Sequence, residues 1–188
     1  LESYDVILNS LGVYKRYNTE RLVTCMGEVI KVGMADLKVC KYPDSLTTLG
    51  LGSCVGVALY DKATKVTGLA HIMLPDSTAI KNNSNIAKFA DTGIDETIRL
   101  MVAMGATKGR IVAKIAGGAN MFHSGLSSAS STLKVGENNV AACKKKLAEL
   151  RIPIIAEDTG LDYGRTVVIR SEDGVFTIKS IGKPLKEI

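Results

Sequence analysis

The stretch LTTLGLGSCVGVALYDKATKVTGLAHIML, residues 46–74, contains two apolar, β-rich runs joined by the polar segment DKATK. Two such runs with a short polar connection predict a pair of antiparallel strands. The first run follows a glycine-rich turn that holds Cys54, and the second contains His71 near its end. In a hairpin closed at DKATK, these two side chains lie near the open end and can touch if they share a face.

Turn-forming residues separate further apolar runs along the chain. Residues 28–40 predict a strand and its continuation, and residues 42–45 predict a turn. Residues 110–122 predict a buried strand that ends in a Gly-Gly turn, and residues 152–160 predict another strand. Two alternating runs around Asp173-Gly174 predict a second hairpin.

Two segments carry apolar residues at helical spacing instead. The first is residues 86–104, and Gly105 follows as a residue typical of helix ends. Val140, Cys143, Leu147 and Leu150 mark the second, which makes Cys143 most simply a core residue. Strands and hairpins with two helices between them predict the α/β class in an α+β-like form, a layered sandwich with mixed or antiparallel sheets and two main helices.

Length and composition predict one domain with an extension. A chain of 188 residues is long enough for one substantial core, which we place in residues 28–188. Residues 1–27 differ from the rest in composition, and we expect them to form an N-terminal extension that need not be ordered. No apolar run reaches the length of a bilayer span, and the first residues lack the charge order of a secretory signal. We therefore expect a cytoplasmic protein.

The cysteines and the charge exclude several classes of function. Four cysteines without CxxC pairs, and only two histidines, show no zinc-type spacing. The net charge of +5 is not concentrated in a basic run with interleaved aromatic residues, so we expect no nucleic-acid partner. An acidic protein partner suits the charge better.

A nucleophilic role for Cys54 requires a base, and an adjacent imidazole lowers the pKa of a thiol. His71 is the candidate base, and backbone N–H groups around Gly52, Ser53 and Cys54 are candidates for an oxyanion hole, because glycine lets a carbonyl approach the chain. A third group normally orients the imidazole. The candidates for this group are Thr47, Thr48, Ser53, Asp76 and the pair Glu157-Asp158.

Ordinary structural roles compete with each of these assignments. A lone cysteine after a glycine-rich turn is more often a small buried residue, and a histidine between alanine and isoleucine is more often a satisfied core group. The turn GLGSCVG is one residue too long for a dinucleotide fingerprint and leads into a strand rather than a helix. Phe122, after the Gly117-Gly118 bend, is either a core aromatic or an exposed docking residue, and His123 is a solvated loop residue.

Five motifs, TLGLGSCVGVALYD, GLAHIMLPDS, FADTGIDETI, KIAGGANMF and AEDTG, occur in this order along the chain. In this combination the chain resembles the CheD family of chemoreceptor glutamine deamidases from about residue 29 to the C-terminus. The resemblance implies an α/β sandwich related to bacterial toxins that deamidate glutamine. It also implies hydrolysis of glutamine side chains on methyl-accepting chemotaxis proteins, giving glutamate and ammonia, in the bacterial cytoplasm at membrane-bound receptor arrays.

Position by position, the resemblance assigns the nucleophile to Cys54, the base to His71 and the third member to Thr48. It places Phe122 on a partner surface, names the chemotaxis phosphatase CheC as a regulatory partner, and requires neither a metal nor an organic cofactor, nor insertion into a membrane. Residues 1–27 are not part of the family pattern. Two rival functions use the same residues: cysteine proteolysis or transamidation, and a non-catalytic binding module in which Cys54 is structural.

Overall fold

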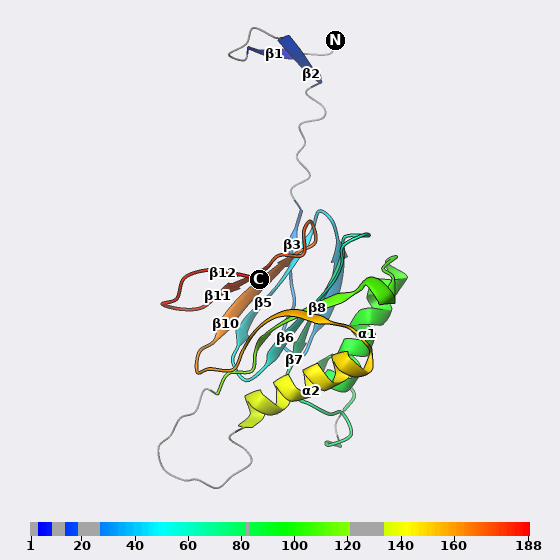
Figure 1. Cartoon of the computed structure of the whole chain (residues 1–188), viewed down its shortest axis with the longest axis vertical. Helices are drawn as coiled ribbons and strands as arrows, with labels where there is room; N and C mark the ends of the chain where they lie inside the picture. Colours follow the sequence, from blue (N-terminus) through cyan, green and yellow to red (C-terminus); the bar gives the residue numbers. More distant parts are fainter. Residues whose placement is uncertain (1–3, 9–13, 19–26, 82, 121–133) are drawn as a thin grey trace.

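The computed structural model describes residues 4–8, 14–18, 27–81, 83–120 and 134–188, and its centre is the hairpin expected from residues 46–74 (Figure 1). Strands β6 (Val55–Asp61) and β7 (Val66–Ile72) pair antiparallel, with Gly56 opposite His71. Every residue of both strands is buried. The hairpin prediction is thus confirmed, and its two strands form the middle of the molecule rather than a solvated edge.

This hairpin belongs to a five-stranded sheet of order β4-β7-β6-β8-β9, which we call the central sheet. Its remaining strands are β4 (Leu37–Lys41), β8 (Val112–Gly117) and β9 (Ile154–Thr159). Pairing is antiparallel except between β8 and β9, which run parallel. The sheet is therefore mixed, as predicted.

The second five-stranded sheet, which we call the outer sheet, has the order β12-β11-β10-β5-β3. It consists of β3 (Val29–Lys31), β5 (Ser45–Leu51), β10 (Arg165–Arg170), β11 (Phe176–Lys179) and β12 (Lys186–Glu187). Strands β10 and β11 form the hairpin predicted around Asp173-Gly174. Separately, β1 (Tyr4–Leu8) and β2 (Tyr14–Asn18) pair antiparallel with each other.

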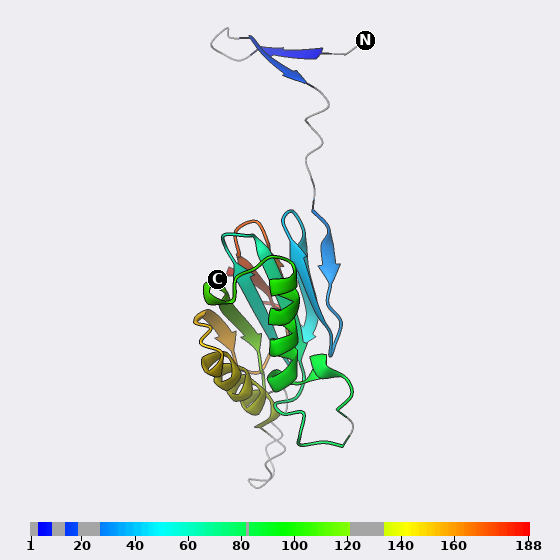
Figure 2. The same cartoon turned by 90° about the vertical axis from the view of Figure 1, so that its right-hand side faces the viewer.

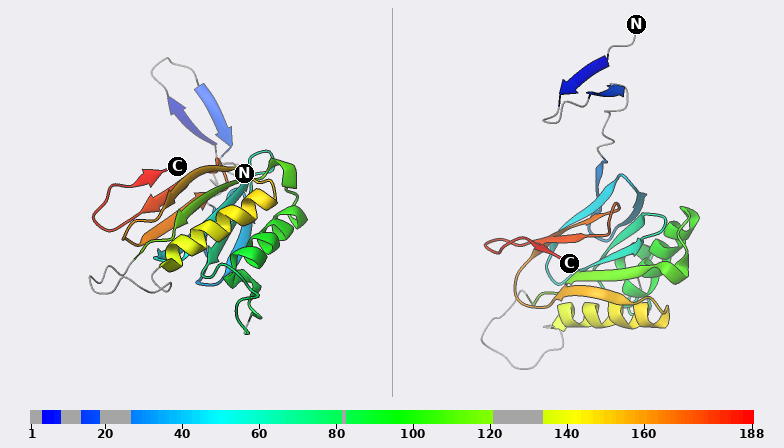
Figure 3. Two further views of the ribbon diagram at one scale, coloured as in Figure 1. Left: turned by 60° about the horizontal axis from the view of Figure 1, so that its bottom comes forward. Right: turned by 45° about the horizontal axis from the view of Figure 1, so that its top comes forward.

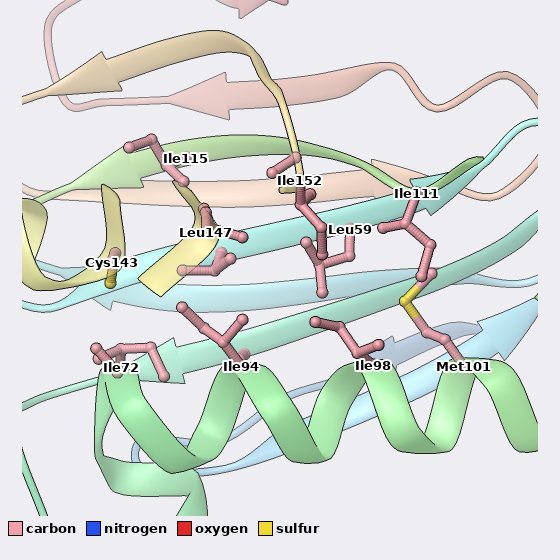
Figure 4. Close-up of a cluster of buried hydrophobic side chains, with 14 of the residues drawn as sticks. Leu59, Ile72, Ile94, Ile98, Met101, Ile111, Ile115, Cys143, Leu147 and Ile152 are labelled. Carbon is pink, nitrogen blue, oxygen red and sulfur yellow. The ribbon is translucent and has the colours of Figure 1, made fainter. Parts of the chain in front are cut away.

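Both long helices pack on one face of the central sheet (Figures 2 and 3). They are α1 (Ala90–Ala103), preceded by the short 3₁₀ turn η2 (Ile86–Lys88), and α2 (Val135–Glu149). A further 3₁₀ turn, η3 (Lys108–Arg110), leads into β8. Ile94, Ile98 and Met101 of α1 face the sheet across a fully apolar layer (Figure 4).

A second apolar layer fills the space between the two sheets. Its members come from β5, β6, β7, β8, β10 and β11, with two more from β4 and the segment after β3: Leu46, Leu51, Ala58, Leu69, Ala116, Val167, Ile169, Phe176 and Ile178, together with Cys40 and Val32. The order of layers is outer sheet, central sheet, helices. Because each strand of a sheet alternates its side chains between two faces, β6 and β7 contribute to both layers.

Two segments differ from the prediction. Residues 28–40 do not form one strand with a continuation, because β3 and β4 belong to different sheets. The Asp36 carboxylate accepts hydrogen bonds from the amides of Gly33 and Leu37, and Ala35 has a φ of 52°, so the chain turns there. Residues 45–51, for which no strand was predicted, form strand β5, which includes Ser45 of the predicted turn and part of the glycine-rich stretch. No helix in the described part of the chain is long and apolar enough to cross a bilayer.

Candidate active site

Thr48, Cys54 and His71 come from β5, from the bend that follows it and from β7, and they lie near the open end of the central hairpin. Thr48 lies in β5, Cys54 in the bend between β5 and β6, and His71 next to the last residue of β7. Thr48 and Leu46 occupy alternate positions of β5 and are both fully buried in the space between the sheets. The structure therefore brings the three predicted residues to the same region.

Thr48 and His71 are joined by a short hydrogen bond across the inter-sheet layer. The Thr48 Oγ1 atom lies 2.7 Å from His71 Nδ1, and the same hydroxyl donates to the carbonyl oxygen of Val32 at 2.9 Å. A threonine hydroxyl has only one proton. Since that proton is donated to Val32, the hydroxyl must accept from the imidazole, and the Nδ1 atom carries the ring proton.

This tautomer leaves the lone pair of the His71 Nε2 atom available as a base. The Nε2 atom is buried and has no hydrogen-bond partner within the described residues. Burial lowers the pKa of His71 below its ordinary value, which keeps the ring neutral. A neutral imidazole with an oriented Nδ1–H and an unpartnered Nε2 is the arrangement that general-base catalysis needs.

Cys54, like His71, borders the inter-sheet layer. The cross-strand partner of His71 is Gly56, and Cys54 lies two residues before Gly56, in the bend that leads into β6. A Cβ atom added to Gly56 would meet Leu51 and Val167, which belong to the inter-sheet layer, and Cys54 packs against that layer as well. Cys54 lies just beyond the last ladder pair, Val55–Ile72, and His71 just inside it, so both border the inter-sheet layer near the open end of the hairpin.

Cys54 differs in exposure from the other described cysteines. Cys40 and Cys143 are buried, and burial raises the pKa of each to about 12. Cys54 is only half-buried. Burial also raises the pKa of the Cys54 thiol above its ordinary value, which is opposite in direction to the lowering expected from an adjacent imidazole.

The carbonyl oxygens of Gly52, Ser53 and Cys54 all accept hydrogen bonds from elsewhere in the fold. The Ala119 amide donates to Gly52 at 2.8 Å, the Asn139 Nδ2 atom to Ser53 at 2.9 Å, and the Gly118 amide to Cys54 at 2.7 Å. The backbone of the bend is therefore fixed by hydrogen bonds to three successive carbonyl oxygens. Such a fixed backbone is the usual basis of a preorganised oxyanion site.

The amides of the same bend divide into two kinds. The Gly52 N–H donates to Gly50 at 3.0 Å and is used within the turn. The amides of Ser53 and Cys54 have no acceptor in the part of the chain that the structure describes. Of the predicted oxyanion donors, the N–H groups of Ser53 and Cys54 have no acceptor among the described residues, whereas the Gly52 N–H is used within the turn.

Other residues predicted as candidates for orienting the His71 imidazole make contacts with other parts of the protein. The Thr47 hydroxyl donates to Val167, the Asp158 carboxylate contacts Arg165 and Lys186, and Glu157 pairs with Lys144. Asp76 accepts from Thr78. None of these contacts involves His71, so among the candidates Thr48 is the one whose side chain is bonded to the imidazole.

Asn139 is the residue near this site that sequence reasoning missed. It is fully buried in α2, and its side chain contacts the backbone on both sides of the Cys54–His71 pair. Asn139 lies four and eight residues before Cys143 and Leu147, on the apolar stripe of the helix. An asparagine at a core position of an amphipathic helix is the sequence signal that identifies it.

The metal-ligating residue types and the predicted partner surface were the remaining features to locate in the structure. Within the described residues, no three side chains of His, Cys, Asp or Glu are grouped so as to hold a metal ion. Phe122 and His123 lie outside the described residues. The docking role predicted for Phe122 therefore stays a prediction.

Comparisons with known proteins agree on one family. A family model described as CheD chemotactic sensory transduction matches residues 73–180, a range that begins just after His71. A protein of Lachnoclostridium phytofermentans named "Probable chemoreceptor glutamine deamidase CheD" is 64% identical over 163 residues, which is 87% of this chain and 100% of that protein. A Caldanaerobacter subterraneus protein of the same name is 53% identical over 161 residues, 86% of this chain and 98% of that one.

One solved structure is also similar, at a much lower level. The Bacillus licheniformis hypothetical protein YfiH matches with a TM-score of 0.41 and 17% sequence identity, over 72% of this chain and 60% of that one. A likeness this low carries no argument about function. The sequence relatives and the geometry of the candidate site are the basis for assigning a function to this chain.

Proposed function

The chain belongs to the CheD family, and on this premise we propose that it is a chemoreceptor glutamine deamidase with Cys54 as nucleophile and His71 as base. The names of the relatives give the activity and the class of substrate. The observation that supports the catalytic assignment best is the hydrogen bond between Thr48 and His71. It leaves the His71 Nε2 atom, which has no partner among the described residues, at the inter-sheet layer against which Cys54 also packs.

The first half of the reaction forms a thioester. The protonated Cys54 thiol loses its proton to the His71 Nε2 atom as the sulfur attacks the carboxamide carbon of a substrate glutamine. A tetrahedral oxyanion forms, and the amides of Ser53 and Cys54 donate hydrogen bonds to it. The C–N bond then breaks, His71 returns the proton to the departing nitrogen, and ammonia leaves.

The second half consumes water. His71, again neutral, removes a proton from a water molecule whose oxygen attacks the thioester carbon. The C–S bond breaks, the proton passes to the sulfur, and the products are glutamate and the free thiol of Cys54. Throughout both halves, Thr48 keeps the Nδ1 atom bonded and stabilises the imidazolium that forms transiently.

Replacing a neutral glutamine by a carboxylate changes the charge of the receptor locally, a kind of change that biases a signalling equilibrium. Regulatory binding of the phosphatase CheC through a surface that includes Phe122, and recruitment to membrane-bound receptor arrays, remain part of this proposal. They depend on the family resemblance, because Phe122 lies outside the described residues. A pull-down of CheC by the wild-type chain and by Phe122→Ala tests this part separately.

The direct test is mass spectrometry of a chemoreceptor cytoplasmic fragment incubated with the wild-type chain or with Cys54→Ala. We expect the wild type to convert specific glutamines to glutamates, which tandem spectra locate, and Cys54→Ala to convert none. Because Cys54 is half-buried at a bend, we expect the Cys54→Ala variant to fold, which circular dichroism checks.

The rival functions give different products in the same experiment. Proteolysis shortens the fragment, and transamidation adds the mass of an amine instead of leaving an acid. A fragment that binds but keeps its mass identifies a binding module. Conversion that persists in Cys54→Ala would exclude the proposed nucleophile.

A further inference from the structure

Asn139 is a buried polar residue on the apolar face of α2. Its side chain is inaccessible to water, and its Oδ1 atom has no hydrogen-bond partner within the described residues. A buried carboxamide with an unpaired acceptor costs stability, and native proteins rarely contain one without a reason. The contacts of the other end of the side chain supply a reason.

The Nδ2 atom of Asn139 makes two hydrogen bonds to the backbone. It donates to the Ser53 carbonyl at 2.9 Å and to the Met73 carbonyl at 2.8 Å. The two N–H bonds of a carboxamide match two carbonyl acceptors, whereas the opposite orientation would place an oxygen against both of them. The orientation of the side chain is thereby determined.

These two bonds span the open end of the central hairpin. The ladder between β6 and β7 ends at the pair Val55–Ile72. Ser53 precedes Cys54 on one strand, and Met73 follows Ile72, the neighbour of His71, on the other. Beyond the last ladder pair, the Asn139 carboxamide is therefore a direct link between the segment that presents the thiol and the segment that presents the imidazole.

We propose that Asn139 is a positioning residue for the Cys54–His71 pair, an inference that rests on the proposed function. It acts with the Gly118 and Ala119 amides, which hold the carbonyls on either side of Ser53. By fixing the Ser53 carbonyl, it directs the Ser53–Cys54 peptide so that the Cys54 N–H faces the opposite way. Asn139 thus sets both the placement of the thiol relative to His71 and the direction of an oxyanion donor.

Three variants separate positioning from packing. Asn139→Asp keeps the shape of the side chain but places an acceptor oxygen against two carbonyl oxygens. Asn139→Ala removes the link without adding repulsion. Asn138→Asp is the matched control, because it makes the same chemical change at the adjacent, exposed position of the same helix.

We expect kcat for deamidation of a chemoreceptor fragment to fall about 100-fold in Asn139→Asp and at least about 10-fold in Asn139→Ala. KM should stay within about threefold in both, because the substrate-binding surface is unchanged. Asn138→Asp should behave as wild type. Circular dichroism and thermal melts establish which fraction of each variant is folded at the assay temperature.

Two results would overturn the inference. A packing role predicts that Asp, the isosteric replacement, is milder than Ala, and that folded variants keep the wild-type kcat. A rise in KM with unchanged kcat would assign Asn139 to substrate binding instead. Failure of the proposed function is distinguishable, since it appears as absent conversion by wild type or as conversion that survives in Cys54→Ala.

Discussion

At the scale of single residues, the feature that matters most is the Thr48 hydroxyl. It donates its one proton to Val32 and accepts from His71, so it fixes the tautomer of the imidazole as well as its orientation. A carboxylate in this position would add a negative charge to the inter-sheet layer. A neutral hydroxyl orients the ring at a lower desolvation cost, which suits a fully buried position.

Replacing Thr48 tests this role with two closely matched variants. Thr48→Val keeps the shape and loses the acceptor, so we expect kcat to fall about 100-fold or more, as when other groups that orient a catalytic histidine are lost. Thr48→Ser keeps the hydroxyl and should retain activity within about tenfold. Steady-state kinetics of deamidation measure both. Equal activity of the Val and Ser variants would show that the hydroxyl has no catalytic part.

The pH dependence follows from the directions of two pKa shifts. Burial lowers the pKa of His71, so the neutral base persists below the ordinary value of about 6.5, and kcat/KM should fall only as the pH drops through that lowered pKa. Burial raises the pKa of Cys54, so the rate of its alkylation by iodoacetamide should still be rising at pH 9. Peptide mapping distinguishes Cys54 from the other cysteines. An alkylation rate that is already at its plateau at pH 6 would instead indicate a preformed thiolate–imidazolium pair.

At the scale of elements, the candidate site lies where the end of β8 and the start of α2 pack against the bend of residues 52–54, which contains Cys54. Gly117 and Gly118 have φ values of 112° and 67°, in the left-handed region that favours glycine. A Cβ atom at Gly117 would overlap the Cys54 carbonyl oxygen, and one at Gly136 of α2 would overlap the Gly118 carbonyl oxygen. The glycines therefore permit the close backbone approach that the Cys54 bend requires.

Gly117→Ala should consequently affect both stability and catalysis. The new methyl group meets backbone rather than a flexible side chain, at a strained φ, so we expect a loss of about 1–3 kcal/mol in the free energy of unfolding. Displacement of the bend should also lower kcat in the folded fraction. Gly109→Ala is the control, since a Cβ atom there meets open space, and its unfolding free energy should change by less than about 0.5 kcal/mol. Urea titration compares them, and similar values for the two variants would contradict this account.

At the scale of the whole molecule, the three layers are held in place by contacts between distant segments. Asp61, at the end of β6, has a fully buried carboxylate that accepts from the Thr107 amide at 2.9 Å and from the Arg110 Nη2 atom at 2.8 Å. These bonds fasten the central hairpin to the segment between α1 and β8. They also hold the pKa of Asp61 well below its ordinary range, with the Arg110 hydrogen bond as the main cause.

Asp61→Asn should therefore reduce stability in a pH-dependent way. A carboxyl whose pKa is lower in the folded than in the unfolded state stabilises the fold above its unfolded value of about 3.9, and that contribution is lost as the pH falls through the folded value. We expect a loss of about 2 kcal/mol at pH 7, and a smaller difference from wild type as the pH approaches 2. Urea unfolding at several pH values measures this, with the exposed Asp162→Asn as control. A difference that is constant with pH would show that the charge of Asp61 is not involved.

Local patterns predicted most of the fold. The hairpin of β6 and β7, the hairpin of β10 and β11, and both helices were predicted because alternation, helical spacing and turn residues act over short stretches of chain. The division of residues 28–40 between two sheets was not predicted. The sheet to which a strand belongs depends on how the layers pack, which involves residues far apart in the sequence and cannot be predicted from a local pattern.

The sequence by itself therefore determined which residues form the central hairpin, and with it the placement of Cys54 near His71 at one open end. The tertiary structure alone decided which further residues contact His71 and the bend at Cys54 in the proposed site. Thr48 meets His71 across two different sheets, and Asn139 reaches Ser53 from a helix 86 positions further along the chain. Contacts within a hairpin follow from pairing register, whereas contacts between layers exist only once the sheets and helices have packed against one another.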